Sequence, residues 1–162
     1  LVGAGRTLTR VSRLDEWSSG EHAPLIETVD QPDATNSLSF LSARTRGTPT
    51  LSWRAGRHSR VRSVTAGPVV ISGNGGGRWT ALSDVTSPLS IRGTSQPLSM
   101  YATNPERAID PEWVITDSEN IQLYSVKTEA GTDGYSIMTS LRIKDSRNVS
   151  VFGSTGYVQL NG

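Results

Sequence analysis

Two segments in the second half of the chain have nearly the same sequence, and this similarity restricts the fold more than any other feature. Residues 113–124 read Trp-Val-Ile-Thr-Asp-Ser-Glu-Asn-Ile-Gln-Leu-Tyr, and residues 141–152 read Leu-Arg-Ile-Lys-Asp-Ser-Arg-Asn-Val-Ser-Val-Phe. The common Asp-Ser-x-Asn sequence begins at Asp117 in the first segment and at Asp145 in the second, a 28-residue offset. A unit that repeats about every 20–50 residues is typical of a solenoid.

Each copy predicts two short strands joined by a polar turn. Apolar and polar residues alternate on both sides of Asp-Ser-x-Asn, as they do when successive side chains point to opposite faces of a strand. The short polar side chains between them favour a turn, because they hydrogen-bond nearby backbone groups. If the copies stack in register, Asn120 and Asn148 form an asparagine ladder at one corner. Burial in that ladder would make Asn148 unavailable as the acceptor of its Asn-Val-Ser glycosylation sequence.

A more distant copy precedes these two. Residues 89–101 align with the first segment at a shorter, 23-residue offset, which places position 98 under position 121. The alignment stacks Leu98 on Ile121, Met100 on Leu123 and Tyr101 on Tyr124. We therefore predict an all-β chain folded as a right-handed parallel β-helix, a solenoid in which each coil needs a neighbour. An antiparallel β-sandwich is the alternative, because it also has many short strands separated by turns.

The predicted coils occupy residues 66–162, and residues 1–65 form a strand and loop region of unclear assignment that packs on the solenoid. The chain has 162 residues, a polar Gly-rich start and no obvious cap at its end, which suggests a fragment or a part of a larger assembly. A bare end of a solenoid exposes strand edges. Another protein chain, or the rest of the same chain, is therefore expected to cover at least one open end.

Composition excludes several classes of protein. The formal net charge of +1 argues against a general nucleic-acid binder. There is no cysteine, so disulfides and thiolate metal sites are excluded. No apolar segment is long enough to predict a membrane span.

Six arginines and no acidic residue lie between Arg44 and Arg62. Arginine suits carboxylates and phosphates because its planar guanidinium binds them with two hydrogen bonds. One interpretation is therefore a groove for an acidic polymer, such as a uronate or sulfated glycan. The other is a solvated strand face whose arginines pair with the acids of residues 21–33, since runs of charge usually lie at the surface.

A glycine-rich segment follows the buried strand predicted at residues 68–72. Glycines at 73 and 75–77 allow positive φ angles and close approach of backbone. A binding loop would use backbone N–H groups for an anion, with Arg78 for charge and Trp79 as a stacking plane. The alternative is a tight corner with Trp79 packed on the neighbouring coil. A P-loop is excluded because no Gly-Lys-Ser/Thr sequence ends the segment.

Two charged loops, residues 104–113 and 127–135, fall on adjacent predicted coils. The 23-residue offset places Glu106 beside Glu129 as a pair of candidate catalytic carboxylates, with Arg107 and Lys127 as charge partners. Paired carboxylates serve as acid and base, or as acid and nucleophile, in glycoside hydrolysis. A basic residue beside acids could instead remove a sugar proton in a lyase. Tyr101 and Trp113 are the candidate sugar-stacking surface. Ordinary surface ion pairs between turn residues are the alternative.

Several of these segments resemble the later coils of secreted pectate-lyase-like β-helix proteins. The resemblance covers about residues 66–162 and rests on four segments: Gly-Gly-Gly-Arg-Trp at 75–79, residues 96–106, residues 120–129 and residues 145–153. It implies a secreted, extracellular protein that acts on a polysaccharide, and it allows Ca²⁺ as a cofactor. Its motifs are turns and stacked apolar residues, so no catalytic residue of the family is carried over.

Two functions follow as expectations. The first is part of a carbohydrate-active β-helix enzyme, a glycoside hydrolase or a polysaccharide lyase. The second is a non-catalytic β-helix for glycan binding, adhesion or surface assembly, because long flat faces suit that role. Whether the chain is an enzyme is left open, and nucleic-acid binding through residues 44–62 is a distant third.

Overall fold

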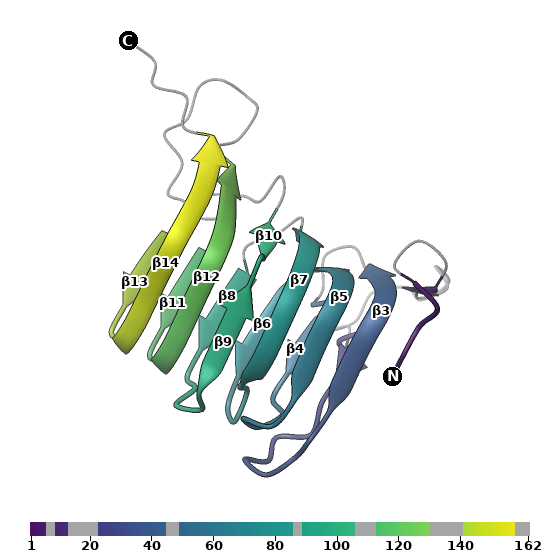
Figure 1. Ribbon diagram of the computed structural model, residues 1–162. Coiled ribbons are helices and arrows are strands. Elements are labelled where there is room, and N and C mark those ends of the chain that lie inside the picture. The colour runs from purple at the N-terminus through teal and green to yellow at the C-terminus, as the bar shows by residue number, and fades with distance from the viewer. Residues whose placement is uncertain are drawn as a thin grey trace.

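The computed structural model describes residues 1–5, 9–12, 23–44, 49–85, 89–105, 113–129 and 141–157. Within these ranges all regular structure is β-strand and no helix is present. Consequently, no described helix has the length and apolar character needed to cross a membrane. Figure 1 shows the strands arranged as two layers of side-by-side arrows.

The strands form two sheets, which we name sheet A and sheet B. Sheet A follows the order β1 (Arg10–Ser12), β3 (Ser37–Arg44), β5 (Arg60–Gly67), β7 (Gly77–Val85), β9 (Leu98–Tyr101), β12 (Glu119–Glu129) and β14 (Arg147–Tyr157), with β10 (Asn104–Pro105) beside β7. Sheet B follows the order β2 (Ile26–Glu27), β4 (Leu51–Trp53), β6 (Val69–Ser72), β8 (Leu89–Arg92), β11 (Trp113–Thr116) and β13 (Leu141–Lys144).

Every strand pairing in the described residues is parallel. The antiparallel β-sandwich considered from the sequence is therefore wrong for this part of the chain. Its signal was ambiguous because short strands and polar turns occur in both architectures. Parallel pairing requires the chain to leave a sheet and return to the same side, and here it does so through the other sheet.

The register agrees with the sequence repeat. Trp113 pairs with Leu141 and Ile121 with Val149, which confirms the offset seen between Asp117 and Asp145. The three stacked pairs predicted from the shorter offset also occur: Leu98 with Ile121, Met100 with Leu123 and Tyr101 with Tyr124. The same two sheets continue on the N-terminal side of residue 66, through β3, β4 and β5. The division at residues 65 and 66 stays a prediction.

The core lies between the two sheets and is filled by alternate residues of their strands. In β6, β8 and β11 the first and third residues are buried, and the second and fourth are not fully buried or are exposed. Trp53 and Trp79 meet edge to face at 5.3 Å between ring centroids, and the Trp53 indole N–H donates to Gly76 O at 3.1 Å. Each fully buried apolar side chain contributes about 1.5–3 kcal/mol.

An asparagine ladder is present at the turn between sheet B and sheet A. Asn148 Nδ2 donates to Asn120 Oδ1 at 2.6 Å, and Asn120 Nδ2 donates to Ser95 O at 3.0 Å. Both asparagines have positive φ angles, 51° and 59°. The predicted ladder is therefore confirmed. The expected burial of Asn148 is wrong, because its side chain belongs to the last described strand of sheet A and is exposed.

A second row of left-handed residues crosses sheet A and was not predicted. On adjacent strands it contains Phe40, Ser63, Ala81, Ala102, Ser125 and Gly153, with φ between 49° and 61°. Buried positions before and after this row are three residues apart, as at Leu38 and Leu41, instead of two. The extra residue makes each strand turn a corner. The corner divides the outer surface of sheet A into two parts.

Candidate functional site

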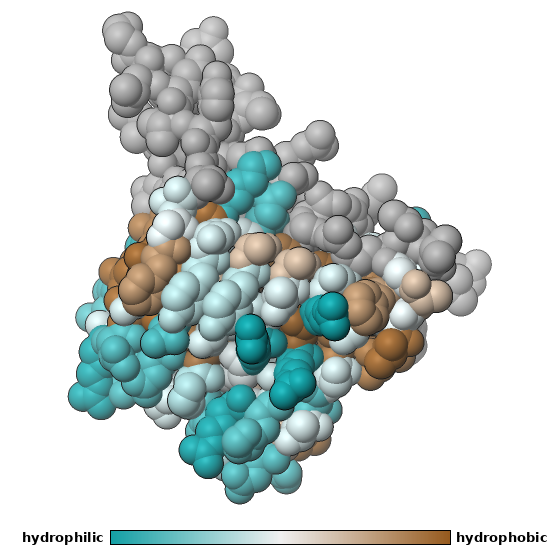
Figure 2. All heavy atoms as spheres, viewed as in Figure 1, coloured by the Kyte–Doolittle hydropathy of each residue, from teal (hydrophilic) through white to brown (hydrophobic). Residues whose placement is uncertain are grey.

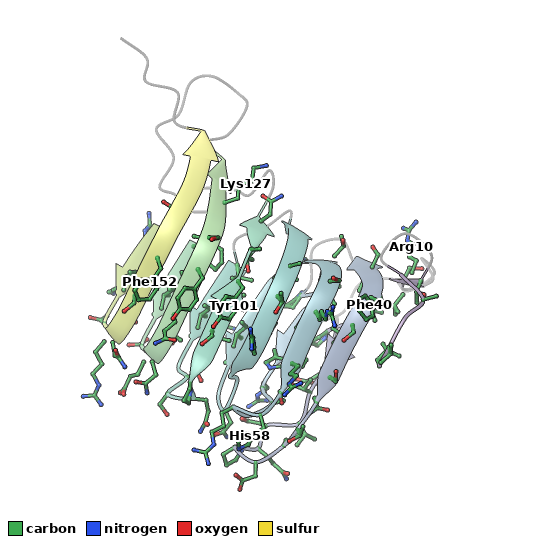
Figure 3. All side chains as sticks on the ribbon, viewed as in Figure 1. Arg10, Phe40, His58, Tyr101, Lys127 and Phe152 are labelled. Atoms are coloured by element: carbon green, nitrogen blue, oxygen red, sulfur yellow. The ribbon has the colours of Figure 1, made fainter. Side chains whose placement is uncertain are left out.

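The outer surface of sheet A before this corner carries two rows of aligned side chains. We call it the arginine–aromatic face. The first row is Ser37, Arg60, Arg78, Ser99, Gln122 and Ser150. The second row is Ser39, Arg62, Thr80, Tyr101, Tyr124 and Phe152. Figure 3 shows the side chains of Tyr101 and Phe152 on the viewer's side of the sheet.

Three rings stack at one end of this face. The Tyr101 and Tyr124 centroids are 4.7 Å apart with planes inclined by 4°, and those of Tyr124 and Phe152 are 4.8 Å apart at 12°. This spacing follows from the sheet, because parallel strands lie about 4.8 Å apart. Both faces of the Tyr124 ring are therefore covered, whereas Phe152 stacks on Tyr124 with one face only. Gln122 lies beside them and accepts hydrogen bonds from Tyr124 Oη at 3.1 Å and Ser99 Oγ at 3.3 Å.

Three exposed arginines lie at the other end of the face. Arg60 and Arg78 are direct register partners on β5 and β7, and Arg62 is two residues after Arg60. The guanidinium carbon of Arg78 is 5.0 Å from the Tyr101 centroid, and that of Arg62 is 5.2 Å from the Phe40 centroid. Figure 2 shows strongly hydrophilic side chains gathered over β5 and β7, with hydrophobic surface toward β3 and β14. Cation–π contacts thus orient two of the three positive groups.

None of these three arginines is paired with a carboxylate among the described side chains. The ion pairs there join Arg54 to Asp30, Lys144 to Asp145 and Arg147 to Glu119. Like charges directly opposite each other on neighbouring strands are destabilising. The like charges of Arg60 and Arg78, which lie opposite each other, therefore raise the free energy of the folded chain.

The sequence offered two interpretations of the segment from Arg44 to Arg62, and the structure confirms surface ion pairing at one of its arginines, while binding of an acidic polymer stays a prediction. Arg54 Nη2 forms an ion pair with Asp30 Oδ2, as the surface-pairing interpretation expected. Arg60 and Arg62 instead point outward on the arginine–aromatic face. The side chains of Arg44 and Arg46 lie outside the described part of the chain.

Asp30 connects three successive passes of the chain. Its Oδ1 accepts hydrogen bonds from the Asn74 backbone N–H at 2.9 Å and from Asn74 Nδ2 at 3.0 Å. The bond from the Asn74 backbone is the main reason why the pKa of Asp30 lies below its usual value, and Arg54 lowers it further. This contact is structural, since it lies in the turns that follow the sheet B strands.

Of the six residues predicted to bind substrate, two lie on the arginine–aromatic face and two are buried in the core. Arg78 and Tyr101 contact each other there. Trp79 and Trp113 are 0% and 1% exposed, so the prediction that they stack on a sugar is corrected. Their neighbours explain the error: successive residues of a strand point to opposite sides, so an outward Arg78 requires an inward Trp79.

The predicted catalytic pair is not placed by the structure. Glu106 and Arg107 lie outside the described residues, and only the backbone of Glu129 is described, at the end of β12. The Lys127 N–H donates to Thr103 O at 2.9 Å. The register that pairs Tyr101 with Tyr124 therefore continues as far as Asn104 and Lys127. Lys127 lies beyond the corner at Ser125, and Figure 3 shows it away from Tyr101.

Two aromatic residues of the face, Tyr124 and Phe152, were missing from the predicted site, and Arg60 and Arg62 were considered only as part of a separate groove between Arg44 and Arg62. The signal for the two rings was present, because Tyr124 and Phe152 end the two aligned segments. The signal for the arginines was weaker. Arg60 and Arg78 are register partners, but the sequence offset between them is shorter than the two offsets of the sequence repeat, so the repeat did not reveal their pairing.

The Ca²⁺ that the resemblance allows stays a prediction. Within the part of the chain that is described, no three His, Cys, Asp or Glu side chains come together as a possible metal site. Comparison with protein-family models, with curated proteins and with solved structures finds no match for the chain.

Proposed function

We propose that the chain is a secreted, right-handed parallel β-helix whose arginine–aromatic face binds an acidic polysaccharide. Two parallel sheets, visited in alternation by successive passes of the chain, support this fold. The hand follows from the general preference of parallel strand connections, which are right-handed in about 98% of cases.

The observation that carries the proposal is the cluster of Arg60, Arg62 and Arg78 with no carboxylate partner among the described side chains. Each guanidinium can donate two parallel hydrogen bonds to a carboxylate or sulfate group. Arg62 and Arg78 are already held against rings, so less side-chain freedom is lost on binding. A ligand with several acidic groups neutralises all three charges at once.

The neighbouring side chains favour a sugar polymer over a single-stranded nucleic acid. Proteins that bind single strands usually stack bases on open aromatic faces. Here one face of Tyr101 is covered by Tyr124 from β12 and the other by Arg78 from β7. Ser37, Ser99, Thr80 and Gln122 add hydrogen-bonding groups suited to sugar hydroxyls. Tyr101 therefore acts by positioning Arg78, not by stacking on the ligand.

The test is binding of the 162-residue chain to polygalacturonate, to a sulfated dextran and to neutral galactan by isothermal titration calorimetry. The acidic polymers should bind with an affinity that falls as salt is added, and galactan should not bind. Because a hydrogen bond to a charged group contributes about 1.5–3 kcal/mol, the double variant Arg60→Gln/Arg78→Gln should bind at least about tenfold more weakly.

The matched control is Arg92→Gln/Lys144→Gln, which removes the same charge from exposed positions of sheet B. It should bind like the unmodified chain. Equal affinity of the arginine–aromatic variant and the control, or equal binding of neutral and acidic polymers, contradicts the proposal. Binding of single-stranded oligonucleotides in preference to the glycans contradicts the choice of ligand.

Cleavage of the same polysaccharide is the second candidate function, by glycoside hydrolysis or by a lyase reaction. It is favoured by the hydrogen bond from Lys127 to Thr103, which keeps the register used to pair Glu106 with Glu129. Release of reducing ends, or of unsaturated sugars absorbing in the ultraviolet, measures it. Glu106→Gln/Glu129→Gln should abolish release without changing circular dichroism, and unchanged turnover would exclude this pair.

A further inference from the structure

The two sheets end in open edges at both ends of the described structure. At one end β13 and β14 each have a neighbour on one side only. Here Ile143, Val151 and Phe152 are 45%, 41% and 49% exposed, whereas Ile115 and Leu123, the register partners of Ile143 and Val151, are fully buried. Such unpaired strand edges accept further strands readily.

The opposite end is formed by β1 and β2, which also have one neighbour each. Val2 is 70% exposed there, and its bridge to Ser39 places it in the same row as Phe152. The second row of the arginine–aromatic face thus has an exposed apolar residue at each of its ends.

The charges at the two ends are complementary. One outward row of sheet B contains Glu27, Ser52, Val70, Ser90, Val114 and Arg142. Its two charged members are the terminal ones, Glu27 at one edge and Arg142 at the other, and both are exposed. If a second copy of the chain continued this row past Arg142, the Glu27 carboxylate of that copy would lie beside the Arg142 guanidinium.

We propose that a second copy of this chain docks head to tail on the first. Strand β13 of one copy lies parallel to β2 of the next, with Arg142 opposite Glu27 and the Phe152 row continued by Val2. The two edges pair their free backbone groups, as in β-strand addition. Because the two surfaces differ, the contact is heterologous and leads to open linear assemblies.

This assembly is independent of the proposed glycan binding, because the arginine–aromatic face is an outer surface of sheet A and the contact uses the strand edges. In the assembly the faces of successive copies form one continuous surface. Binding to a glycan and docking between copies can therefore succeed or fail separately.

Sedimentation velocity on the 162-residue chain tests the inference over a wide range of concentration. The average mass should grow with concentration, without a limit at the dimer. Glu27→Arg and Arg142→Glu should each weaken association about tenfold, because each places like charges at the contact and loses an ion pair. Circular dichroism confirms that the variants fold.

The decisive sample is an equimolar mixture of the two variants. In the mixture each altered edge meets an opposite charge on the other variant, so association should return to the unmodified level. Arg92→Glu is the control, since Arg92 is exposed in sheet B but is not at an edge, and it should assemble normally. A chain that stays monomeric at all concentrations, a closed dimer, or a mixture that fails to reassociate would each overturn the proposal.

Discussion

Asp30 is the side chain whose charge the structure ties most directly to the fold. Its pKa is lowered, mainly by the bond from the Asn74 backbone, so the folded state favours the carboxylate. The unfolded state binds the proton more readily, and the stabilisation is complete only above the unfolded pKa, which is 3.8. It is lost as pH falls through the lower folded pKa.

Asp30→Asn should therefore destabilise the chain at pH 7 and flatten the loss of stability as pH falls below about 4. The amide keeps an oxygen for the Asn74 N–H, so the change removes mainly the charge. Because the Asp30 side chain is 31% exposed and its partner Arg54 is 40% exposed, the loss should stay below about 1 kcal/mol. Urea unfolding across this pH range measures it. The control is Asp33→Asn, at an exposed position nearby, which should leave the loss of stability at low pH unchanged.

Tyr101 provides a second test at the scale of a residue. Tyr101→Leu removes the platform of Arg78 while leaving every arginine in place. We expect weaker binding of acidic glycan, by about twofold to fivefold, since a cation–π contact at an exposed site contributes about 0.5–1 kcal/mol. Tyr101→Phe retains the ring and should restore the affinity measured by calorimetry. If both variants bind alike, the ring does not position Arg78.

At this scale the predicted stacking role of Trp79 and Trp113 is wrong because both are buried, whereas substrate binding by Arg78 and Tyr101 stays a prediction. A shift of one residue along a strand moves a side chain from the surface to the core. At 78–79 the alternative that packs Trp79 inward is the one the structure confirms, and it agrees with the rarity of fully buried arginine. Trp79 packs against Trp53 of sheet B across the core.

At the scale of the element, the left-handed row across sheet A is the feature that bends the strands. Gly153 is its one glycine, and a Cβ added there would meet no atom within 4 Å. Gly153→Ala should therefore isolate the cost of backbone strain, about 1–2 kcal/mol for a left-handed alanine. The reduced freedom of the unfolded chain offsets about 0.4–1 kcal/mol of it.

A net loss of about 1 kcal/mol in urea unfolding is thus expected for Gly153→Ala. The reverse change in the same row, Ala102→Gly, should be neutral or slightly stabilising because Ala102 already has φ of 50°. No loss on Gly153→Ala would mean that the last strand does not keep this conformation in solution.

The asparagine row and the corner row of left-handed residues differ in how well the sequence predicted them. The asparagine ladder was predicted because Asn120 and Asn148 recur at the offset of the sequence repeat. The corner row was missed because it is made of Phe40, Ser63, Ala81, Ala102, Ser125 and Gly153, which share no chemistry. Tertiary packing imposes that conformation, through the buried residues on either side of each corner.

At the scale of the whole molecule, the two visible repeats predicted the stacking of the last three passes of the chain. The passes before residue 66 were assigned to a separate region because their sequences do not match the repeat. The sequence offset between β5 and β7, where Arg60 lies opposite Arg78, is also shorter than the offsets of the repeat. Yet both sheets run without a break from β3 to β14 and from β2 to β13. The spacing varies because turns can change in length while the strands keep their register.

This continuity predicts a single cooperative unfolding transition across residue 65. The contact of Trp53 with Trp79 joins the two sides of that boundary within one core. Leu51→Ala on one side and Ile115→Ala on the other both remove fully buried side chains and should each cost about 2–5 kcal/mol. Each should shift one common transition, seen alike by tryptophan fluorescence and circular dichroism. Two transitions, with Leu51→Ala moving only the first, would instead show that residues 1–65 fold as a separate unit.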